Sequence, residues 1–177
     1  MSKQKYAKSV EPDEVVALNA QFGPAPLRTI RLEVDDPFLT GEHQMLTLPD
    51  RRAEICYVMH RGEESDLLLH IKRFYPPEGY RLPTGGIQQG EAVMATLARE
   101  IMEETGQPVA GAAADWSRAV GVERCLGIVA YTLRHDTLGD ISFATYHFLV
   151  RMPTTGVLDP QDADEQIAGW RWLPVAH

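Results

Sequence analysis

Apolar residues along the chain recur with two different periods, which predict strands around one strong helix. Alternating or continuous apolar runs predict five strands, at Ile55–Met59, Leu67–Ile71, Val120–Arg134, Ile141–Arg151 and Ile167–Leu173. Gly139-Asp140 predicts a turn between the third and fourth of these. Residues 91–105 contain neither Gly nor Pro and predict a helix, which Gly106 ends as a left-handed cap. This order of elements predicts an α/β fold with a central mixed β-sheet.

The first 52 residues are patterned more weakly and contain no motif with recognisable chemistry. Pro12, followed by two acidic residues, predicts a short helix that Gly23-Pro24 ends. The alternation of Ile30, Leu32 and Val34 with polar residues predicts a strand over residues 27–34. We therefore divide the chain into an N-terminal arm, residues 1–52, and a main domain, residues 53–177.

The predicted helix over residues 91–105 carries two neighbouring stripes of side chains. The helical period places four apolar residues on a core-facing stripe, Met94, Leu97, Ala98 and Ile101. The same period, about 100° per residue, places Glu100, Glu103 and Glu104 on a second stripe beside it. A solvated acidic face, with Arg99 paired to Glu103, is the alternative interpretation. Three carboxylates at the edge of a core repel one another, however, and a bound hard cation relieves this repulsion. Oxygen ligands favour Mg²⁺ or Mn²⁺ over zinc.

The spacing around this helix resembles the Nudix box of the Nudix hydrolase family. Gly85 is followed after five residues by Glu91 and after seven more by Arg99-Glu100-Ile101, and Glu103-Glu104 and Gly106 complete the pattern. The box spans Gly85 to Gln107, where Gln107 replaces the family's aliphatic residue. The flanking stretches at residues 82–86 and 170–174 also resemble the family, and the resemblance covers roughly Ile55 to Pro174.

This resemblance implies a Nudix-type α/β/α sandwich and a role for each matching residue. Glu100, Glu103 and Glu104 match the family's metal ligands, which hold Mg²⁺ or Mn²⁺. Gly85 and Gly86 match a loop where the backbone approaches metal or phosphate closely. Arg99 and Glu91 match residues that orient the acidic stripe.

The reaction implied is hydrolysis of the pyrophosphate bond in a nucleoside diphosphate linked to another moiety, with a small nucleotide derivative as substrate. A carboxylate must accept the proton of the attacking water. Glu100 is the first choice for this role and Glu165 the second, ahead of Asp162 and Asp164. Three basic residues are candidates to bind substrate phosphate, with solvated cations as the alternative interpretation: Lys72, Arg73 and Arg81.

Two rival functions remain open at this stage. A catalytically silent Nudix-type domain that senses a nucleotide should have lost box carboxylates, and all of them are present here. An isomerase that shares the fold needs a cysteine poised at the substrate. Neither Cys56 nor Cys125 has a sequence context that supports this role.

Composition and charge narrow the partners and the location. The 177 residues carry a net charge of −8, which disfavours binding to duplex nucleic acid. No apolar run approaches the length of a membrane span, and the two distant cysteines predict reduced thiols. We therefore expect a cytoplasmic protein. Family chains continue beyond the position of Pro174 into a closing helix, whereas this sequence stops at His177. Either the predicted helix near Asp13–Ala20 covers that face of the sheet, or a second subunit does. We hypothesise a homodimer to which the arm contributes.

Overall fold

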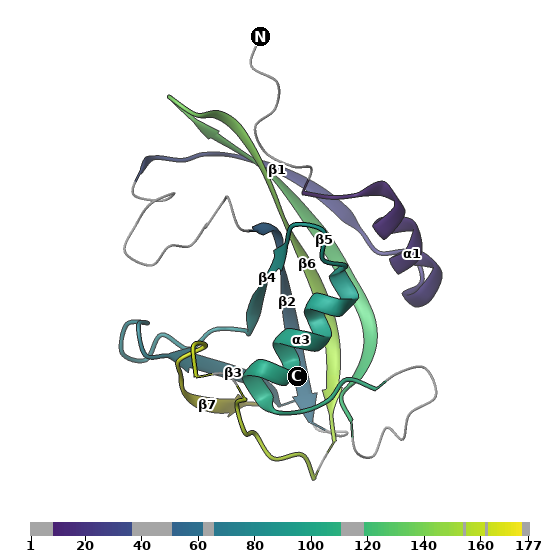
Figure 1. Ribbon diagram of the computed structural model, residues 1–177, viewed down its shortest axis with the longest axis vertical. Helices are drawn as coiled ribbons and strands as arrows, with labels where there is room; N and C mark the ends of the chain where they lie inside the picture. The colour runs from purple at the N-terminus through teal and green to yellow at the C-terminus, as the bar shows by residue number, and fades with distance from the viewer. Residues whose placement is uncertain are drawn as a thin grey trace.

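The computed structural model describes residues 9–36, 51–61, 66–110, 119–153, 155–161 and 163–174. Two helices and seven strands follow one another along these residues (Figure 1). Their order is α1 (Pro12–Phe22), β1 (Leu27–Glu33), β2 (Arg51–Arg61), β3 (Leu67–Lys72), β4 (Thr84–Gln88), α3 (Val93–Thr105), β5 (Gly121–His135), β6 (Gly139–Met152) and β7 (Ile167–Leu173). The five strands and the helix predicted for the main domain are confirmed, and so are the helix and the strand of the arm.

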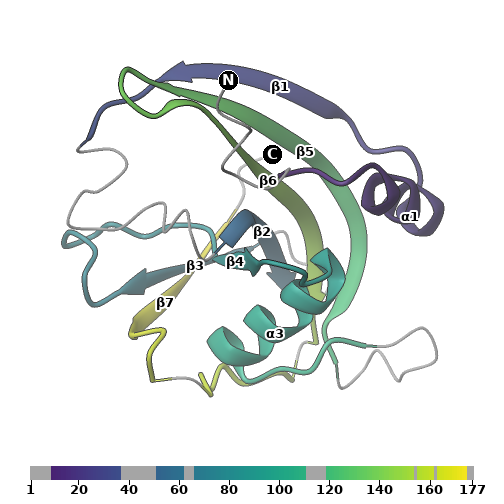
Figure 2. The same ribbon diagram turned by 45° about the horizontal axis from the view of Figure 1, so that its top comes forward.

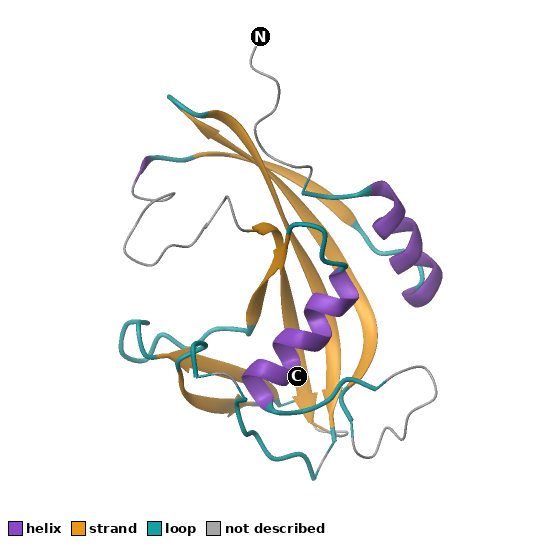
Figure 3. Ribbon diagram, in the orientation of Figure 1, coloured by secondary structure: helices purple, strands orange, loops and turns teal. Residues whose placement is uncertain are grey.

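The strands form one sheet in the order β1-β5-β6-β2-β3-β7, and β4 pairs with β2 outside this path. β2 and β6 run parallel, as do β1 and β5, whereas the remaining pairs are antiparallel. The long β5 and β6 curve past the other strands, and the figures show β1 following β5 along its outer edge (Figures 2 and 3). The predicted α/β fold with a central mixed sheet is confirmed.

The pairing of β2 differs from a simple hairpin in a way that matters for the site. β2 meets β3 only where His60 lies opposite Leu67, while the first half of β2 pairs with β4 instead. β3 and β4 therefore leave β2 at different heights. Glu104 of α3 contacts both Tyr57 of β2 and Lys72 of β3.

One hydrophobic core holds the sheet and both helices together. Every second residue of β2 from Ala53 to Met59 is fully buried, as the two-residue period of a strand requires. Leu97 of α3 and Leu18 of α1 belong to the same cluster of buried residues. Phe22 at the end of α1 also packs edge-to-face on Phe148 of β6, with ring centroids 6.2 Å apart. Among the described residues, both helices thus pack on the same face of the sheet.

The buried face of α3 is rotated from the one that the sequence predicts. Met94 and Ala98 are only half-buried, whereas Glu100 and Glu104 are buried together with Leu97 and Ile101. A prediction from apolar residues alone places the buried face of α3 incorrectly, because Glu100 and Glu104 are themselves part of that face. Gly106 ends the helix with φ 71°, which confirms the predicted left-handed cap.

An ion pair as well as apolar contacts attaches α1 to the start of β2. Arg52 is the last residue of the arm and already belongs to this strand. The Arg52 guanidinium binds the Glu14 carboxylate of α1 and the backbone carbonyls of Ser9 and Glu91. Tyr146 donates a hydrogen bond to the same glutamate, at 3.2 Å. Because a buried charge is stable only when it is paired, Arg52 requires α1 in place. Within the described residues, no helix has the length and apolarity needed to cross a membrane.

If α1 is an integral part of the fold, its one fully buried apolar residue should matter for stability. We expect Leu18→Ala to lower the free energy of unfolding by about 2–4 kcal/mol, because it leaves a cavity in the core. Val16→Ala on the same helix is the control: Val16 is 67% exposed, against 3% for Leu18, and its loss should have little effect. Urea unfolding of both variants measures the difference. Equal midpoints would contradict the packing of α1 described above.

Candidate active site

Three carboxylates from two separate parts of the chain meet at one end of α3. Each of Glu100, Glu104 and Glu165 offers an oxygen that lies within 4.8 Å of those of the other two. Glu100 and Glu104 are one helical turn apart and buried, 4% and 1% exposed, while Glu165 is half-buried. Such a group of oxygen donors matches the preference of hard divalent cations.

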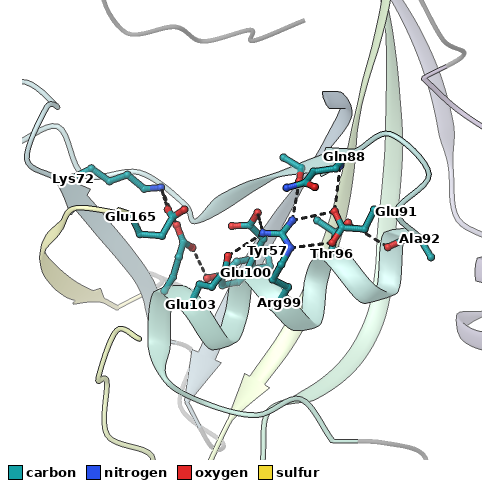
Figure 4. A network of polar contacts seen from close by, with 12 residues as sticks. Tyr57, Lys72, Gln88, Glu91, Ala92, Thr96, Arg99, Glu100, Glu103 and Glu165 are labelled. Carbon is teal, nitrogen blue, oxygen red and sulfur yellow. Dashed lines mark hydrogen bonds and ion pairs between the residues drawn. The ribbon is translucent and has the colours of Figure 1, made fainter. Parts of the chain in front are cut away.

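The pairing of β7 with β3 brings Glu165 to this position. Lys72 at the end of β3 lies opposite Ile167, the first residue of β7. The Arg73 amide also donates a hydrogen bond to the Gln166 carbonyl, at 2.9 Å. Glu165 directly precedes Gln166, which this hydrogen bond holds in place, and its side chain faces Lys72, as Figure 4 shows.

The Lys72 ammonium partly neutralises the three carboxylates. It binds the Glu165 carboxylate and lies 3.1 Å from Glu104 Oε1. Burial alone would lower the pKa of Lys72, but Glu104 and Glu165 raise it above its ordinary value. The ammonium is therefore charged at neutral pH. One positive charge against three carboxylates still leaves a negative site.

Arg99 holds the acidic end of α3 against the loop that precedes the helix (Figure 4). Its Nε and Nη2 donate to the two oxygens of Glu91, at 2.9 and 3.0 Å, and Nη2 also donates to the Gly86 carbonyl at 3.0 Å. Its Nη1 donates to Glu100 Oε1 at 2.8 Å and to Glu103 Oε2 at 2.9 Å. The structure thus shows the contacts that an orienting residue needs, and it places Glu103 on Arg99 outside the group of three carboxylates.

Gly85 allows β4 to approach Glu100 closely. A Cβ atom built on Gly85 would lie 1.9 Å from Glu100 Cδ, far inside van der Waals contact. Gly86 is also constrained, because its Cβ would lie 2.9 Å from Arg51 Cδ. Both glycines are needed for space rather than for an unusual φ angle. The resemblance predicts a loop at these two glycines, whereas both lie in β4, a strand that the sequence does not predict. The backbone of this strand lies directly beside a buried carboxylate.

Burial holds two of the carboxyl groups in a protonation equilibrium near neutrality. Desolvation raises the pKa of Glu100 to about 8, although the Arg99 charge opposes this, and Glu104 and Glu165 add to it. Desolvation likewise raises the pKa of Glu104 to about 7, against the opposing effects of Lys72 and Tyr57. Glu100 and Glu104 repel each other when both are ionised, so the two carboxyl groups titrate as a coupled pair.

The residues of the cluster fit a divalent cation. Glu104 Oε1 is buried and accepts no well-aligned hydrogen bond, despite the Lys72 ammonium 3.1 Å away. A buried carboxylate oxygen without a donor is costly unless a cation satisfies it. Its other oxygen accepts a hydrogen bond from the Tyr57 hydroxyl at 2.6 Å, which fixes the orientation of the carboxylate.

The cluster opens into a cleft of about 290 Å³. Several predicted site residues line it, namely Lys72, Arg81, Gly85, Gly86, Glu100 and Glu165. Three aromatic or cyclic residues and three polar ones complete the described lining: Phe74, Tyr75, Pro76, Arg51, Glu54 and Thr84. Arg73, also a predicted phosphate ligand, is exposed and does not line the cleft. Asp164 does not line it either, and Asp162 lies outside the described residues.

Sequence reasoning missed Tyr57 and His70, which both contact Glu104. Each lies within an otherwise apolar segment of a strand. A polar group buried in such a segment indicates a buried hydrogen-bonding or charged partner nearby. His70 Nδ1 lies 3.5 Å from Glu104 Oε1, and burial lowers the pKa of His70 to about 3, so the ring is neutral. Both cysteines are buried and reduced, and burial raises the pKa of the Cys56 thiol to about 12. This thiol is therefore inert, which argues against the isomerase alternative.

Comparison with known proteins places this geometry in a family. One similar solved structure is the E. coli dihydroneopterin triphosphate pyrophosphohydrolase, with 16% sequence identity over 71% of this chain and 82% of that chain and a TM-score of 0.49. The NUDIX domain of Shewanella oneidensis NrtR complexed with ADP ribose has 20% identity over 69% of this chain and 71% of that chain, with a TM-score of 0.47. A C. elegans Ap4A hydrolase has 18% identity over 69% of this chain and 79% of that chain, with a TM-score of 0.47. No curated protein matches the sequence. The family model described as NUDIX domain matches residues 49–177. The chain therefore belongs to the NUDIX domain family, the Nudix hydrolases.

Proposed function

We propose that this chain is a metal-dependent hydrolase that cleaves the pyrophosphate bond of a nucleoside diphosphate linked to another moiety. The observation that carries this proposal is the meeting of Glu100, Glu104 and Glu165 beside the backbone of Gly85, at the wall of a cleft. Lys72 and Arg81 line the same cleft and supply positive charge for phosphate oxygens. The cleft therefore combines acidic and basic groups, as cleavage of a metal-bound diphosphate requires.

Glu100 and Glu104, with Glu165 beside them, would hold Mg²⁺ or Mn²⁺. Glu103 is a predicted ligand too, but it lies outside this group of three and contacts Arg99 through Oε2. When bound, the cation neutralises phosphate oxygens and lowers the pKa of a water molecule. The remaining chemistry is positioning, which the fixed carboxylates and Arg99 provide.

The proton of the attacking water needs a carboxylate that faces the cleft. Glu100 and Glu165 line it, whereas Glu103 and Glu104 do not. Glu100 is our first candidate, since its pKa of about 8 suits proton transfer near neutral pH. Glu165 is the second candidate; it lines the cleft and contacts the Lys72 ammonium.

All box carboxylates are present, which favours hydrolysis over the sensing of a nucleotide without cleavage. The homodimer and the cytoplasmic location stay predictions of the sequence. Sedimentation of the intact chain tests the first of these: a monomer at all concentrations would contradict it.

Removal of one buried carboxylate tests the metal site. We expect Glu104→Gln to lower turnover on the best substrate by about 100-fold, equivalent to about 2.7 kcal/mol, because it removes a charged ligand while it keeps the side-chain volume. The assay screens nucleotides with Mg²⁺ and Mn²⁺ and reads phosphate release after a coupled phosphatase. Glu78→Gln is the matched control, since the Glu78 side chain is 79% exposed and lies outside the cleft lining. Wild-type turnover in Glu104→Gln would refute the assignment.

Metal binding should depend on pH because cation and proton compete for the same carboxylates. Burial raises the pKa values of Glu100 and Glu104 to about 8 and about 7, so these groups carry protons at pH 6 that a cation must displace. We expect Mn²⁺ affinity to rise between pH 6 and pH 8, by up to about 10-fold per pH unit for each proton released. Calorimetry in two buffers of different ionisation enthalpy counts these protons. An affinity that stays constant with pH, with no proton release, would contradict the buried cluster.

A further inference from the structure

A fourth carboxylate, Glu54, lines the cleft without belonging to the group of three. It lies on β2 between the fully buried Ala53 and Ile55, so its side chain points to the face of the sheet opposite the core. In register it lies opposite Gly86 of β4 and Thr145 of β6. Glu54 therefore borders Gly85 and Gly86 of β4 on the cleft side of the sheet.

The stability of the fold gives no reason for an acid at this position. Burial raises the pKa of Glu54, which means that desolvation of the carboxylate costs free energy; the Thr145 hydrogen bond and the Arg51 charge oppose this shift. A negative charge beside a cleft for phosphate also repels the substrate. An apolar residue like its neighbours in β2 would avoid both costs. The position is explained if the carboxylate accepts hydrogen bonds from something that enters the cleft.

The surroundings of Glu54 indicate what that group is. Arg51, Lys72 and Arg81 line the same cleft, so an additional cationic group on the substrate would be repelled. Thr145 Oγ1 donates to Glu54 Oε1 at 2.9 Å and thereby fixes the carboxylate plane. A fixed carboxylate can accept from two neighbouring donors at once. The matching chemistry is a neutral group that presents two adjacent N–H or O–H donors.

The aromatic part of the cleft lining offers contacts that do not depend on hydrogen-bond direction. Phe74 is 44% exposed and packs edge-to-face on Tyr75, and Arg81 covers the Tyr75 ring. An exposed aromatic ring can stack on any nucleobase, so it supports affinity for all of them. Discrimination between nucleosides must then come from a directional polar group, and Glu54 has the geometry for this.

We propose that Glu54, held by Thr145, determines specificity by accepting hydrogen bonds from paired neutral donors on the nucleoside of the substrate. This inference rests on the proposed function. Two sources supply such donors: the N1–H and N2 amine of guanine, and the hydroxyl pair of ribose. Phosphate and metal contacts belong to other residues, so Glu54 acts on substrate choice and not on the cleavage step.

The test uses α,β-methylene analogues of guanosine, inosine and 2′-deoxyguanosine diphosphate, whose bridging carbon blocks cleavage. Calorimetry with Mg²⁺ measures their affinities for the wild-type chain and for Glu54→Gln, which keeps the side-chain volume. We expect the wild type to bind the guanosine analogue about 10- to 100-fold more tightly than the inosine or the deoxy analogue. The reason is that loss of one donor leaves a Glu54 carboxylate oxygen without a hydrogen-bond partner in the complex. Weaker binding of the inosine analogue identifies the base as the group that donates to Glu54, and weaker binding of the deoxy analogue identifies the sugar.

Glu54→Gln should remove this discrimination while its Mn²⁺ affinity stays that of the wild type. Glu123→Gln, on β5 outside the cleft lining, is the control and should discriminate as the wild type does. Equal binding of all three analogues by the wild type, or unchanged discrimination in Glu54→Gln, overturns the inference and leaves the proposed function standing. Failure of every analogue to bind the wild type also overturns the inference, whereas the proposed function is decided separately by the turnover screen and Glu104→Gln.

Discussion

The contacts of one guanidinium set the geometry of the whole site. Arg99 ties α3 to the preceding loop through Glu91 and the Gly86 carbonyl, and it orients Glu100 and Glu103. The adjacent carboxylates raise the pKa of Arg99 even though its partial burial opposes this, so the charge is permanent. A fork of fixed donors positions several acceptors at once, which lysine in the same place would not do. The approach of β4 to Glu100 depends on this clamp, because Gly85 tolerates the contact but does not by itself enforce it.

The sequence indicates the local part of this arrangement well and the long-range part poorly. Spacing within the box predicts α3, its cap at Gly106 and an orienting role for Arg99 and Glu91, because all of these lie within about two dozen residues. Glu165 is different: it reaches the site only through the register of β7 on β3, which local pattern does not fix. The same holds for the parallel pairing of β1 with β5, which joins segments about a hundred residues apart. Strand existence was predictable, but strand partners were not.

Polar residues in apolar strands were the signal that sequence reasoning overlooked. Tyr57 and Glu54 interrupt the apolar pattern of β2, and both prove to face functional carboxylates or the cleft. A helical wheel also assigned the glutamates of α3 to a neighbouring stripe, whereas Glu100 and Glu104 lie on the buried face. In each case hydrophobicity was treated as the only reason for burial. Active sites bury charged groups at a cost in folding free energy. At such positions the periodic pattern of apolar residues is interrupted because function requires a polar side chain there.

The position of Lys72 has a consequence for how the chain acquires a cation. Its ammonium already lies between Glu104 and Glu165, where positive charge is most needed. If a divalent ion binds there as proposed, it exchanges for this ammonium, and the free energy gained is the difference between two sets of contacts. Because Lys72 already neutralises part of the negative charge, that difference would be smaller than at a site without an internal counter-ion. The displaced ammonium would stay at the wall of the cleft, where it would be available to a phosphate oxygen.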